Sequence, residues 1–225
     1  DNIYEDLNAI PKTTGTQQLQ SSIVVMDPYS GAVVALSGGV GEKDRNFPLN
    51  RATGTQRSPG SAFKPIASYG PATELGYITP NTWVRDESYI TLSGTSWFPQ
   101  NDGGDNYGLM TIFEALQYSL NTVAAQIVDK LTPEVCYNYL IQKLGVTSLV
   151  PDDCAYAPMA LGQLTNGITV REMAAAYCSF VNDGVFTYSR TYSLVTDKQG
   201  NTVIDNSPST VQAFSANTAH VMTYM

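Results

Sequence analysis

Three helix starts in the middle of the chain carry their own capping residues, and they constrain the fold more than any other feature of the sequence. Thr111 and Thr169 are each followed three positions later by a glutamate. This is the pattern of a capping box, in which the hydroxyl and the carboxylate each accept a hydrogen bond from a free backbone N–H. Thr132 is followed by a proline, which suits the first helical position. These signals predict helices over about 111–129, 133–144 and 170–183.

Segments of strand-like composition flank the capped helices. Residues 22–37 (SIVVMDPYSGAVVALS) and 192–205 (YSLVTDKQGNTVID) each hold two β-rich runs around turn residues, so both are predicted to be hairpins. A helix is predicted from about residue 58 to 75 and another from Ser215 onward, whereas 80–106 is expected to be irregular. Strands, then helices, then strands indicate an α+β fold.

Composition and charge narrow the class of function. The chain has 225 residues, 43% of them hydrophobic, which is enough for a core. The net charge is −8 and the isoelectric point about 4.5, so we expect no nucleic acid partner, because nucleic acids select basic surfaces. No run of about 18 apolar residues is present. We expect residues 1–20 to form a linker or entering arm and 21–225 to form the domain.

The sequence gives little support for a metal site or a histidine triad. Cys136, Cys154 and Cys178 lack the spacing of a zinc site, and one bridge, between Cys136 and Cys154, stays open. The acidic run 101–106 (NDGGDN) is expected to be a solvated loop. His220 is the single histidine, so a Ser-His-Asp triad would require it, and a position on a helix face is the better expectation. We expect neither a metal nor a cofactor.

A serine and a lysine stand three residues apart in an otherwise apolar segment, 57–69 (RSPGSAFKPIASY). Ser61 and Lys64 would be neighbours on one face of a helix. A lysine can take a proton from a serine if its pKa is lowered. Phe63 and Ile66 would supply the burial, and the helix N-terminus would supply partial positive charge. An ordinary lysine in a surface ion pair fits the same spacing.

A second polar pair, Ser119 and Asn121, lies in the apolar segment 114–127 (EALQYSLNTVAAQI). Residues two apart do not share a helix face. Both side chains could therefore face one cleft only if the helix breaks there, on a loop between two helices. Ordinary polar residues on a helix surface are the alternative, and the same spacing recurs at Ser215 and Asn217.

Together, Ser-x-x-Lys followed by Ser-x-Asn resembles the signature of the penicillin-binding proteins and class A β-lactamases. The flanking residues resemble the class A, bifunctional penicillin-binding proteins in particular. They are RATGTQRSPGSAFKPIASY around the first motif, EALQYSLNTVAAQI around the second, WFPQN (97–101), MALGQLTNGITVREMAAAYCSFVNDG (159–184) and the opening hairpin. The resemblance covers the chain from about residue 20 to its end.

This resemblance implies a transpeptidase fold with an antiparallel sheet subdomain and an all-helical subdomain at about 76–183. It also implies a serine-type D-Ala-D-Ala transpeptidase or carboxypeptidase. Ser61 would attack the penultimate D-alanine carbonyl of a peptidoglycan stem peptide, and Lys64 would accept its proton. Ser119 would relay a proton to the leaving group, and Asn121 would hold the substrate amide and the Lys64 ammonium.

Other implications of the resemblance concern partners and surroundings. Gly60, Trp97 and Asn101 would line the substrate cleft, and β-lactams would acylate Ser61 as mimics of D-Ala-D-Ala. The Ser61 N–H would form the oxyanion hole with a second N–H from a strand. The family also implies an extracytoplasmic place at the bacterial cell membrane, with an N-terminal anchor and a glycosyltransferase domain outside these residues.

The family's third motif, Lys-Thr-Gly or Lys-Ser-Gly on a strand beside the nucleophile, is absent from the sequence. Lys12-Thr13-Thr14-Gly15 precedes Ser61, Lys143-Leu144-Gly145 is expected to end a helix, and Lys198-Gln199-Gly200 is expected in a hairpin turn. We therefore expect an incomplete transpeptidase domain whose third-motif strand lies on a C-terminal piece beyond these residues.

Two alternatives stay open. A β-lactamase or β-lactam sensor would share Ser-x-x-Lys. A class A β-lactamase also needs a deacylating glutamate, and the corresponding region 149–162 (LVPDDCAYAPMALG) offers Asp152 and Asp153 but no glutamate. The second alternative is a catalytically incomplete fragment that packs with a partner chain and performs no chemistry.

We predict that residues 1–225 alone react with penicillin slowly or not at all, and that extending the chain past Met225 accelerates acylation. One oxyanion-hole donor is worth roughly a hundred- to thousandfold in rate, and the absent strand would carry one. The measurement is a penicillin acylation time course on the two chains. Equal rates would show that the third motif is dispensable or that one of the three lysine–glycine segments replaces it.

Overall fold

The computed structural model describes residues 20–41, 48–87 and 91–225. Within them, every sheet is a two-stranded antiparallel pair. Both predicted hairpins, 22–37 and 192–205, are confirmed, whereas the predicted arm lies outside the described residues except for Gln20. The pairs are β1 (Ile23–Met26) with β2 (Val33–Ser37), β3 (Trp83–Asp86) with β4 (Gly108–Thr111), β5 (Val185–Thr187) with β8 (Thr210–Gln212), and β6 (Leu194–Thr196) with β7 (Thr202–Asp205).

Helices make up most of the remaining regular structure. The helices predicted at 133–144 and 170–183 are confirmed as α6 (Pro133–Leu144) and α8 (Val170–Val181), and the last predicted helix is α9 (Ala216–Tyr224). The other elements are α2 (Arg51–Gly54), α3 (Gly70–Glu74), α4 (Ile112–Gln117), α5 (Asn121–Leu131), α7 (Tyr156–Leu161), the 3-10 turns η1 (Gly60–Phe63) and η3 (Pro151–Asp153), and the π-helical turn η2 (Pro65–Tyr69).

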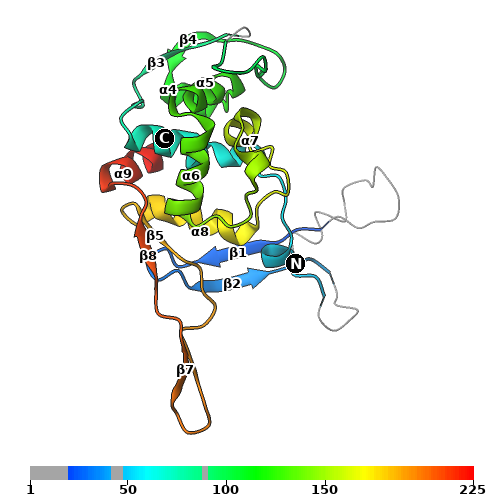
Figure 1. Cartoon of the computed structure of the whole chain (residues 1–225), viewed down its shortest axis with the longest axis vertical. Helices are drawn as coiled ribbons and strands as arrows, with labels where there is room; N and C mark the ends of the chain where they lie inside the picture. Colours follow the sequence, from blue (N-terminus) through cyan, green and yellow to red (C-terminus); the bar gives the residue numbers. More distant parts are fainter. Residues whose placement is uncertain (1–19, 42–47, 88–90) are drawn as a thin grey trace.

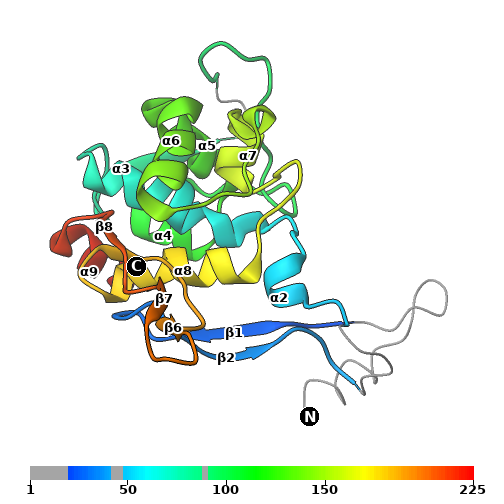
Figure 2. The same cartoon turned by 60° about the horizontal axis from the view of Figure 1, so that its bottom comes forward.

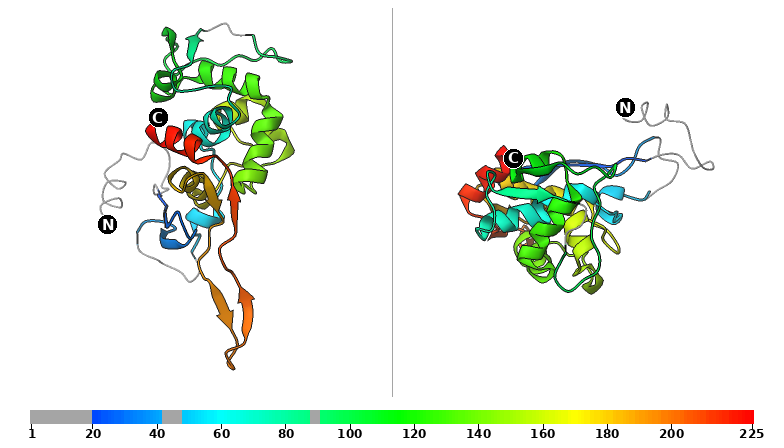
Figure 3. Two further views of the ribbon diagram at one scale, coloured as in Figure 1. Left: turned by 90° about the vertical axis from the view of Figure 1, so that its left-hand side faces the viewer. Right: turned by 90° about the horizontal axis from the view of Figure 1, so that it is seen from above.

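These elements form a helical body that rests on the first hairpin. α8 packs on β1, and β5 and α9 pack on α8 in turn (Figures 1 and 2). The β6–β7 hairpin projects from the body at the end away from β3 and β4 (Figure 3). None of the described helices combines the length and the apolar character that a membrane span requires. Helices together with antiparallel strand pairs agree with the predicted α+β class.

The structure corrects the sequence prediction at three places. The helix predicted over 111–129 is wrong as a single element, because α4 ends at Gln117 and α5 begins only at Asn121. The stretch 80–106 is not wholly irregular, because it contains β3, whose partner β4 follows it. The segment predicted as a helix over 58–75 is helical but passes through a 3-10 turn, a π-helical turn and the short helix α3.

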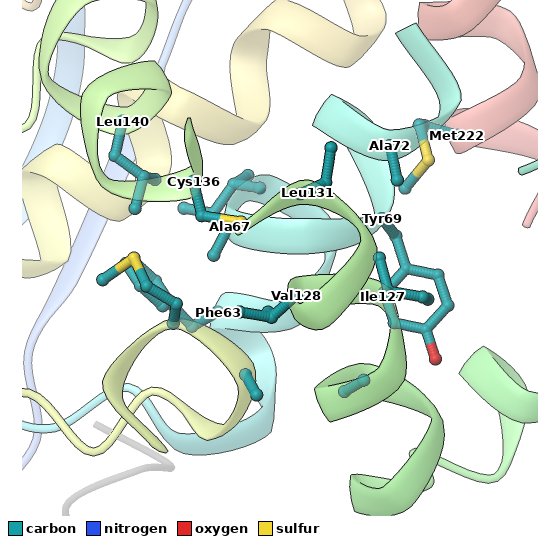
Figure 4. Close-up of a cluster of buried hydrophobic side chains, with 14 of the residues drawn as sticks. Phe63, Ala67, Tyr69, Ala72, Ile127, Val128, Leu131, Cys136, Leu140 and Met222 are labelled. Atoms are coloured by element: carbon teal, nitrogen blue, oxygen red, sulfur yellow. The ribbon is translucent and has the colours of Figure 1, made fainter. Parts of the chain in front are cut away.

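A continuous apolar core surrounds the segment that carries Ser61 and Lys64. In η1 and η2, Phe63, Ile66 and Tyr69 have no exposed surface. Burying a large apolar side chain stabilises a fold by about 1.5–3 kcal/mol, so packing holds this segment on several sides. Figure 4 shows the side chains that α5 and α6 bring against it, Ile127, Val128, Leu131, Cys136 and Leu140, and Met222 of α9, which lies beside Ala72 of α3.

Glu172 closes the capping box of α8 and also ties α8 to the loop after α6. Its Oε2 accepts from Thr169 N at 3.1 Å and Thr169 Oγ1 at 2.8 Å, and its Oε1 accepts from Thr147 N and Oγ1, each at 2.9 Å. Burial raises the pKa of Glu172, but the hydrogen bonds outweigh burial and hold this pKa below its usual value.

Glu172→Gln is expected to lower the free energy of unfolding at neutral pH by on the order of 1 kcal/mol, the usual scale of a lost cap. Because the folded pKa of Glu172 is depressed, its contribution is complete above an unfolded pKa of about 4.3 and is lost as the pH falls through the folded value. The difference from wild type should therefore shrink in acid. Urea denaturation of both chains at neutral pH and in acid measures this difference in the free energy of unfolding.

Glu114→Gln is the matched control. Glu114 closes the capping box of α4, and within the described part of the chain its carboxylate is bonded to Thr111 alone. A smaller loss is expected for this exposed box, because no second segment is attached to it. Equal losses in the two variants would show that the Thr147 contacts add no stability.

Candidate active site

The side chain of Lys64 is fully buried, and three oxygens surround its nitrogen. Nζ donates to the Ser119 carbonyl oxygen at 2.6 Å and to Asn121 Oδ1 at 2.7 Å, and it lies 3.2 Å from Ser119 Oγ. Lys64 follows directly after η1, whereas Ser119 and Asn121 come from the junction of α4 and α5. The two sequence motifs therefore meet at one nitrogen atom.

These three oxygens suit both protonation states of Lys64. A carbonyl or amide oxygen can only accept a hydrogen bond, whereas a hydroxyl can accept or donate one. A charged Lys64 donates to all three oxygens. A neutral Lys64 can keep its two N–H groups on the Ser119 carbonyl and Asn121, which leaves a lone pair for a hydroxyl. Burial lowers the pKa of Lys64 from 10.5 to about 8, so a useful fraction is neutral near neutral pH.

The break between α4 and α5 places Ser119. Its φ is 56°, a left-handed conformation that costs a residue other than glycine about 1–3 kcal/mol. Ser119 N donates to Leu116 O at 2.9 Å and Leu120 N donates to Ala115 O at 3.0 Å, so the tight turn is closed by backbone hydrogen bonds. The reversal of the chain brings both the carbonyl and the hydroxyl of Ser119 to Lys64.

The oxygen and the nitrogen of the Asn121 side-chain amide are both hydrogen-bonded. Its Oδ1 accepts from Lys64 Nζ, and its Nδ2 donates to Gln100 O at 2.8 Å. An amide nitrogen carries two hydrogens, so one N–H of Asn121 remains for a ligand. The predicted meeting of Ser119 and Asn121 with Lys64 is confirmed as geometry, but only Ser119 lies on the predicted connection between two helices, because Asn121 is the first residue of α5.

Ser61 lies in η1, at the start of the helical segment, with its side chain exposed. The backbone around it is held from α8 and from the end of α7. Tyr177 OH donates to Ala62 O at 2.6 Å, and burial raises the pKa of Tyr177 to about 12, which keeps it a neutral donor. Gly162, with φ of 67°, comes so close that an added Cβ would lie 2.3 Å from Gly60 O. A larger residue at 162 would displace the Ser61 turn.

The proton transfer predicted from Ser61 to Lys64 needs the two side chains within hydrogen-bond reach of each other. Although both residues are described, no hydrogen bond joins Ser61 Oγ to Lys64 Nζ, and the lysine is turned toward Ser119 and Asn121. The physical reason is the number of donors: an ammonium has three hydrogens, and three oxygens already surround it.

The other predicted site residues lie around this centre in different ways. Gly60 immediately precedes Ser61 with φ of 56°. Trp97 is half-buried and packs against the hydrophobic core. Asn101 is 8% exposed, and its Oδ1 accepts from the backbone N–H of Asn121 at 2.8 Å. Substrate contact by Gly60, Trp97 and Asn101 stays a prediction, as do the catalytic roles of the two motifs.

Asp86, Gln100 and Tyr177, which hydrogen-bond to residues of the site, were not identified from the sequence. Asp86 accepts from Asn101, Gln100 O accepts from Asn121, and Tyr177 donates to Ala62 O. Asp86 and Gln100 fall in the stretch that was expected to be irregular, and Tyr177 lies in a helix far along the chain. Gln100 and Tyr177 lie in segments that carry the family resemblance, 97–101 and 159–184, but that resemblance assigns neither of them a role. Their roles follow only from the pairing of β3 with β4 and from the packing of α8 on η1 and the neighbouring segments.

The remaining sequence predictions fall away from this site. Lys143-Leu144-Gly145 ends α6, with Gly145 in a left-handed conformation, and Lys198-Gln199-Gly200 lies in the β6–β7 turn, both as predicted. Lys12-Thr13-Thr14-Gly15 lies outside the described residues. His220 is exposed on α9, 3.1 Å from Asp183 Oδ1.

The described residues contain no cluster of three or more His, Cys, Asp or Glu side chains placed to hold a metal ion. Cys136, Cys154 and Cys178 are all free, and the bridge left open between Cys136 and Cys154 is not formed. In the run 101–106, the side chains of Asp102 and Asp105 are exposed, whereas Asn101 is buried.

The known proteins that resemble this chain in sequence include several penicillin-binding proteins. The chain is 32% identical over 225 residues to penicillin-binding protein 4 of Bacillus subtilis, which covers 96% of this chain and 35% of that protein. It is 33% identical over 218 residues to penicillin-binding protein 1A of Clostridium acetobutylicum, covering 92% of this chain and 26% of that protein. The chain thus spans about a third or less of the length of these relatives.

Solved structures share the fold. The D,D-transpeptidase domain of a peptidoglycan glycosyltransferase from Eggerthella lenta superposes with a TM-score of 0.72 at 21% identity, over 98% of this chain and 61% of that chain. Penicillin-binding protein 1A from Haemophilus influenzae gives 0.69 at 24% identity, over 88% and 29%. Residues 21–225 match the family described as the penicillin binding protein transpeptidase domain. The chain therefore belongs to the family of penicillin-binding-protein transpeptidase domains.

Proposed function

We propose that this chain is the nucleophile-bearing part of a penicillin-binding DD-transpeptidase, which cross-links peptidoglycan stem peptides through an acyl-serine intermediate. The observation that carries the proposal is the buried nitrogen of Lys64, held by Ser119 and Asn121 at 2.6–3.2 Å, three residues after the exposed Ser61. An alcohol needs a base to act as a nucleophile at neutral pH, and a desolvated lysine is one such base.

Acylation begins with loss of the Ser61 proton. Neutral Lys64 accepts that proton while Ser61 Oγ bonds to the carbonyl carbon of the penultimate D-alanine, and the carbonyl oxygen takes the negative charge. The resulting ammonium has three N–H groups, and the two oxygens of Ser119 together with Asn121 Oδ1 accept them. These contacts stabilise the charge that develops on Lys64 in the transition state.

Departure of D-alanine needs a proton on its nitrogen. Ser119 Oγ, 3.2 Å from Lys64 Nζ, can give its proton to the departing amine and take one from Lys64. The amine of a second stem peptide then attacks the acyl-serine, the reverse proton path restores Ser61, and a cross-link forms. A β-lactam follows the first step, but its opened ring stays attached to the acyl group.

Substrate would be oriented by Asn121 and by the oxyanion hole. The N–H of Asn121 that Gln100 does not use can donate to a backbone carbonyl of the stem peptide. The Ser61 N–H would supply one oxyanion-hole donor, and a strand outside these residues would supply the other. Action outside the cytoplasmic membrane and linkage to a glycosyltransferase domain belong to the same proposal.

A fluorescent penicillin is expected to label the chain extended past Met225 at Ser61, and the label should disappear in Ser61→Ala, because that variant lacks the nucleophilic oxygen. Denaturing electrophoresis and the mass of the labelled peptide measure this. Ser58→Ala serves as the matched control, because Ser58 donates to Gly162 O instead of facing Lys64. It should keep the label.

Labelling of Ser61→Ala at the wild-type rate would contradict the proposed nucleophile. Absence of any label in the extended wild-type chain would favour the catalytically incomplete fragment. Rapid loss of the label after it forms would favour a β-lactamase.

The acylation rate is expected to rise with pH through a midpoint of about 8, because the pKa of Lys64 is lowered by burial and only the neutral amine can accept the Ser61 proton. Carbon-13 NMR of the lysine ε-carbons gives the same titration without substrate. Lys64→Arg identifies the resonance, since it removes that signal. A Lys64 midpoint near the ordinary 10.4 would contradict the role of burial.

A further inference from the structure

Helix α5 has no N-cap residue of its own that can accept a hydrogen bond. Leu120 occupies the N-cap position and makes no side-chain cap. Two of the free N–H groups of the first turn are instead accepted by Asn101 Oδ1, which lies 2.8 Å from Asn121 N and 3.3 Å from Thr122 N. A residue 20 positions upstream therefore does the work of the cap, at the turn that carries Asn121.

Asn101 has no hydrogen-bonding capacity left for a substrate. Its Oδ1 accepts two N–H groups of α5, and its Nδ2 donates both hydrogens, to Asp86 Oδ1 at 2.8 Å and to Asp105 O at 3.0 Å. An amide offers two donors and two acceptor sites, and all four are used. With 8% of its surface exposed, Asn101 lies behind the site.

Asp86 anchors this arrangement from the end of β3. It is 1% exposed, and it accepts hydrogen bonds from Asn101 Nδ2, from Thr122 Oγ1 and from Tyr107 N at 2.8 Å. No described cation forms an ion pair with it. Neutral hydrogen-bond donors surround its carboxylate, and Asn101 Nδ2 is one of them. Because that nitrogen faces Asp86, the amide oxygen of Asn101 faces the positive N-terminal end of α5.

We propose that Asp86 and Asn101 are positioning residues for the acyl-transfer site. Asp86 orients the Asn101 amide, Asn101 fixes the first turn of α5, and that turn holds Asn121 Oδ1 against Lys64 Nζ at 2.7 Å. Asn101 thus acts through Asn121 and not through the substrate contact predicted from the sequence. Asp86 has no role in the prediction from sequence.

One test needs no catalytic activity. First-turn N–H groups lack an acceptor within the helix and ordinarily exchange fast with solvent. Hydrogen exchange followed by NMR should find Asn121 and Thr122 protected in the wild-type chain. In Asn101→Ala, both should exchange at least about tenfold faster, whereas Val128 in the middle of α5 should be unchanged. Unprotected Asn121 and Thr122 in wild type would overturn the proposal.

A second test is the acylation rate of the extended chain with a fluorescent penicillin, which rests on the proposed function. In Asp86→Asn, the new Nδ2 replaces one of the two carboxylate oxygens. In one orientation it faces Asn101 Nδ2 and in the other it faces Tyr107 N–H, so a donor faces a donor in both. Asn101→Asp replaces the 2.8 Å hydrogen bond by two facing carboxylates. Each single variant should slow acylation by about 10- to 100-fold, the scale of a misplaced active-site group.

The exchange variant Asp86→Asn with Asn101→Asp separates positioning from general stability. It restores the bond between positions 86 and 101 with donor and acceptor reversed and keeps an acceptor at the N–H groups of α5, but it loses the donor that faces Asp105 O. The acylation rate and the protection at Asn121 should therefore return in part and exceed those of both single variants. An exchange variant that is acylated no faster than the single variants, with a melting temperature equal to wild type, would overturn the proposal.

Asp153→Asn is the matched control. Asp153 is also a fully buried carboxylate, and it accepts from Val150 N, Thr165 N and Thr165 Oγ1 at 2.7–3.0 Å, none of which contacts Lys64. It should lower the melting temperature and leave the acylation rate of the folded chain near wild type. A loss of rate equal to that of Asp86→Asn would show that loss of a buried carboxylate slows acylation through a structural effect only.

If the wild-type chain is never acylated, the proposed function fails. The hydrogen-exchange measurement at Asn121 and Thr122 needs no acylation and still decides the positioning role.

Discussion

The ammonium of Lys64 is buried, and no carboxylate of the described residues pairs with it; the arrangement of the site follows from that constraint. Taking an unpaired charge out of water costs several kcal/mol unless polar groups replace the water. Here three oxygens replace it, and burial also lowers the pKa to about 8, so the proton is held weakly. The described ion pair of Arg85 with Glu87 lies on the surface and leaves Lys64 unbalanced.

Those oxygens must be rigid, and the rigidity comes from a break in a helix. A continuous helix would turn Ser119 and Asn121 to different faces, whereas the left-handed Ser119 brings both to one nitrogen. The conformation costs about 1–3 kcal/mol, which three other contacts offset: the hydrogen bonds to Lys64, the backbone bonds of the turn and the cap that Asn101 supplies to α5. Strain, burial and capping therefore depend on one another within a few residues.

Local chemistry made much of this fold predictable from sequence. The capping boxes at Thr111 and Thr169, the proline after Thr132 and the two turn signals predicted helix starts and hairpin positions that the structure confirms. Ser119 and Asn121 were predicted to meet Lys64, because their spacing fits a cleft only at a break. The β3–β4 pair and Asp86 were not predictable in this way, because strands whose nearest partners are Asp86 and Gly108 leave no short-range pattern in the sequence. For a related reason the Lys64 contacts could not be read from spacing alone: the spacing brings Ser61 and Lys64 near, but competing acceptors decide which contact forms, and Lys64 turns to Ser119 and Asn121.

That competition also gives the site an order of events. A charged Lys64 has all three hydrogens facing oxygens, so Ser61 cannot donate to it. When the proton leaves, one contact must be released. The Ser119 carbonyl and Asn121 Oδ1 can only accept and hold the shorter contacts, at 2.6 and 2.7 Å, so the 3.2 Å contact with the Ser119 hydroxyl is the one that changes. The same hydroxyl is the group that can pass a proton onward. The lone pair of a neutral Lys64 therefore lies on the side of the Ser119 hydroxyl, and in the proposed function this makes Ser119 the group that exchanges a proton with Lys64.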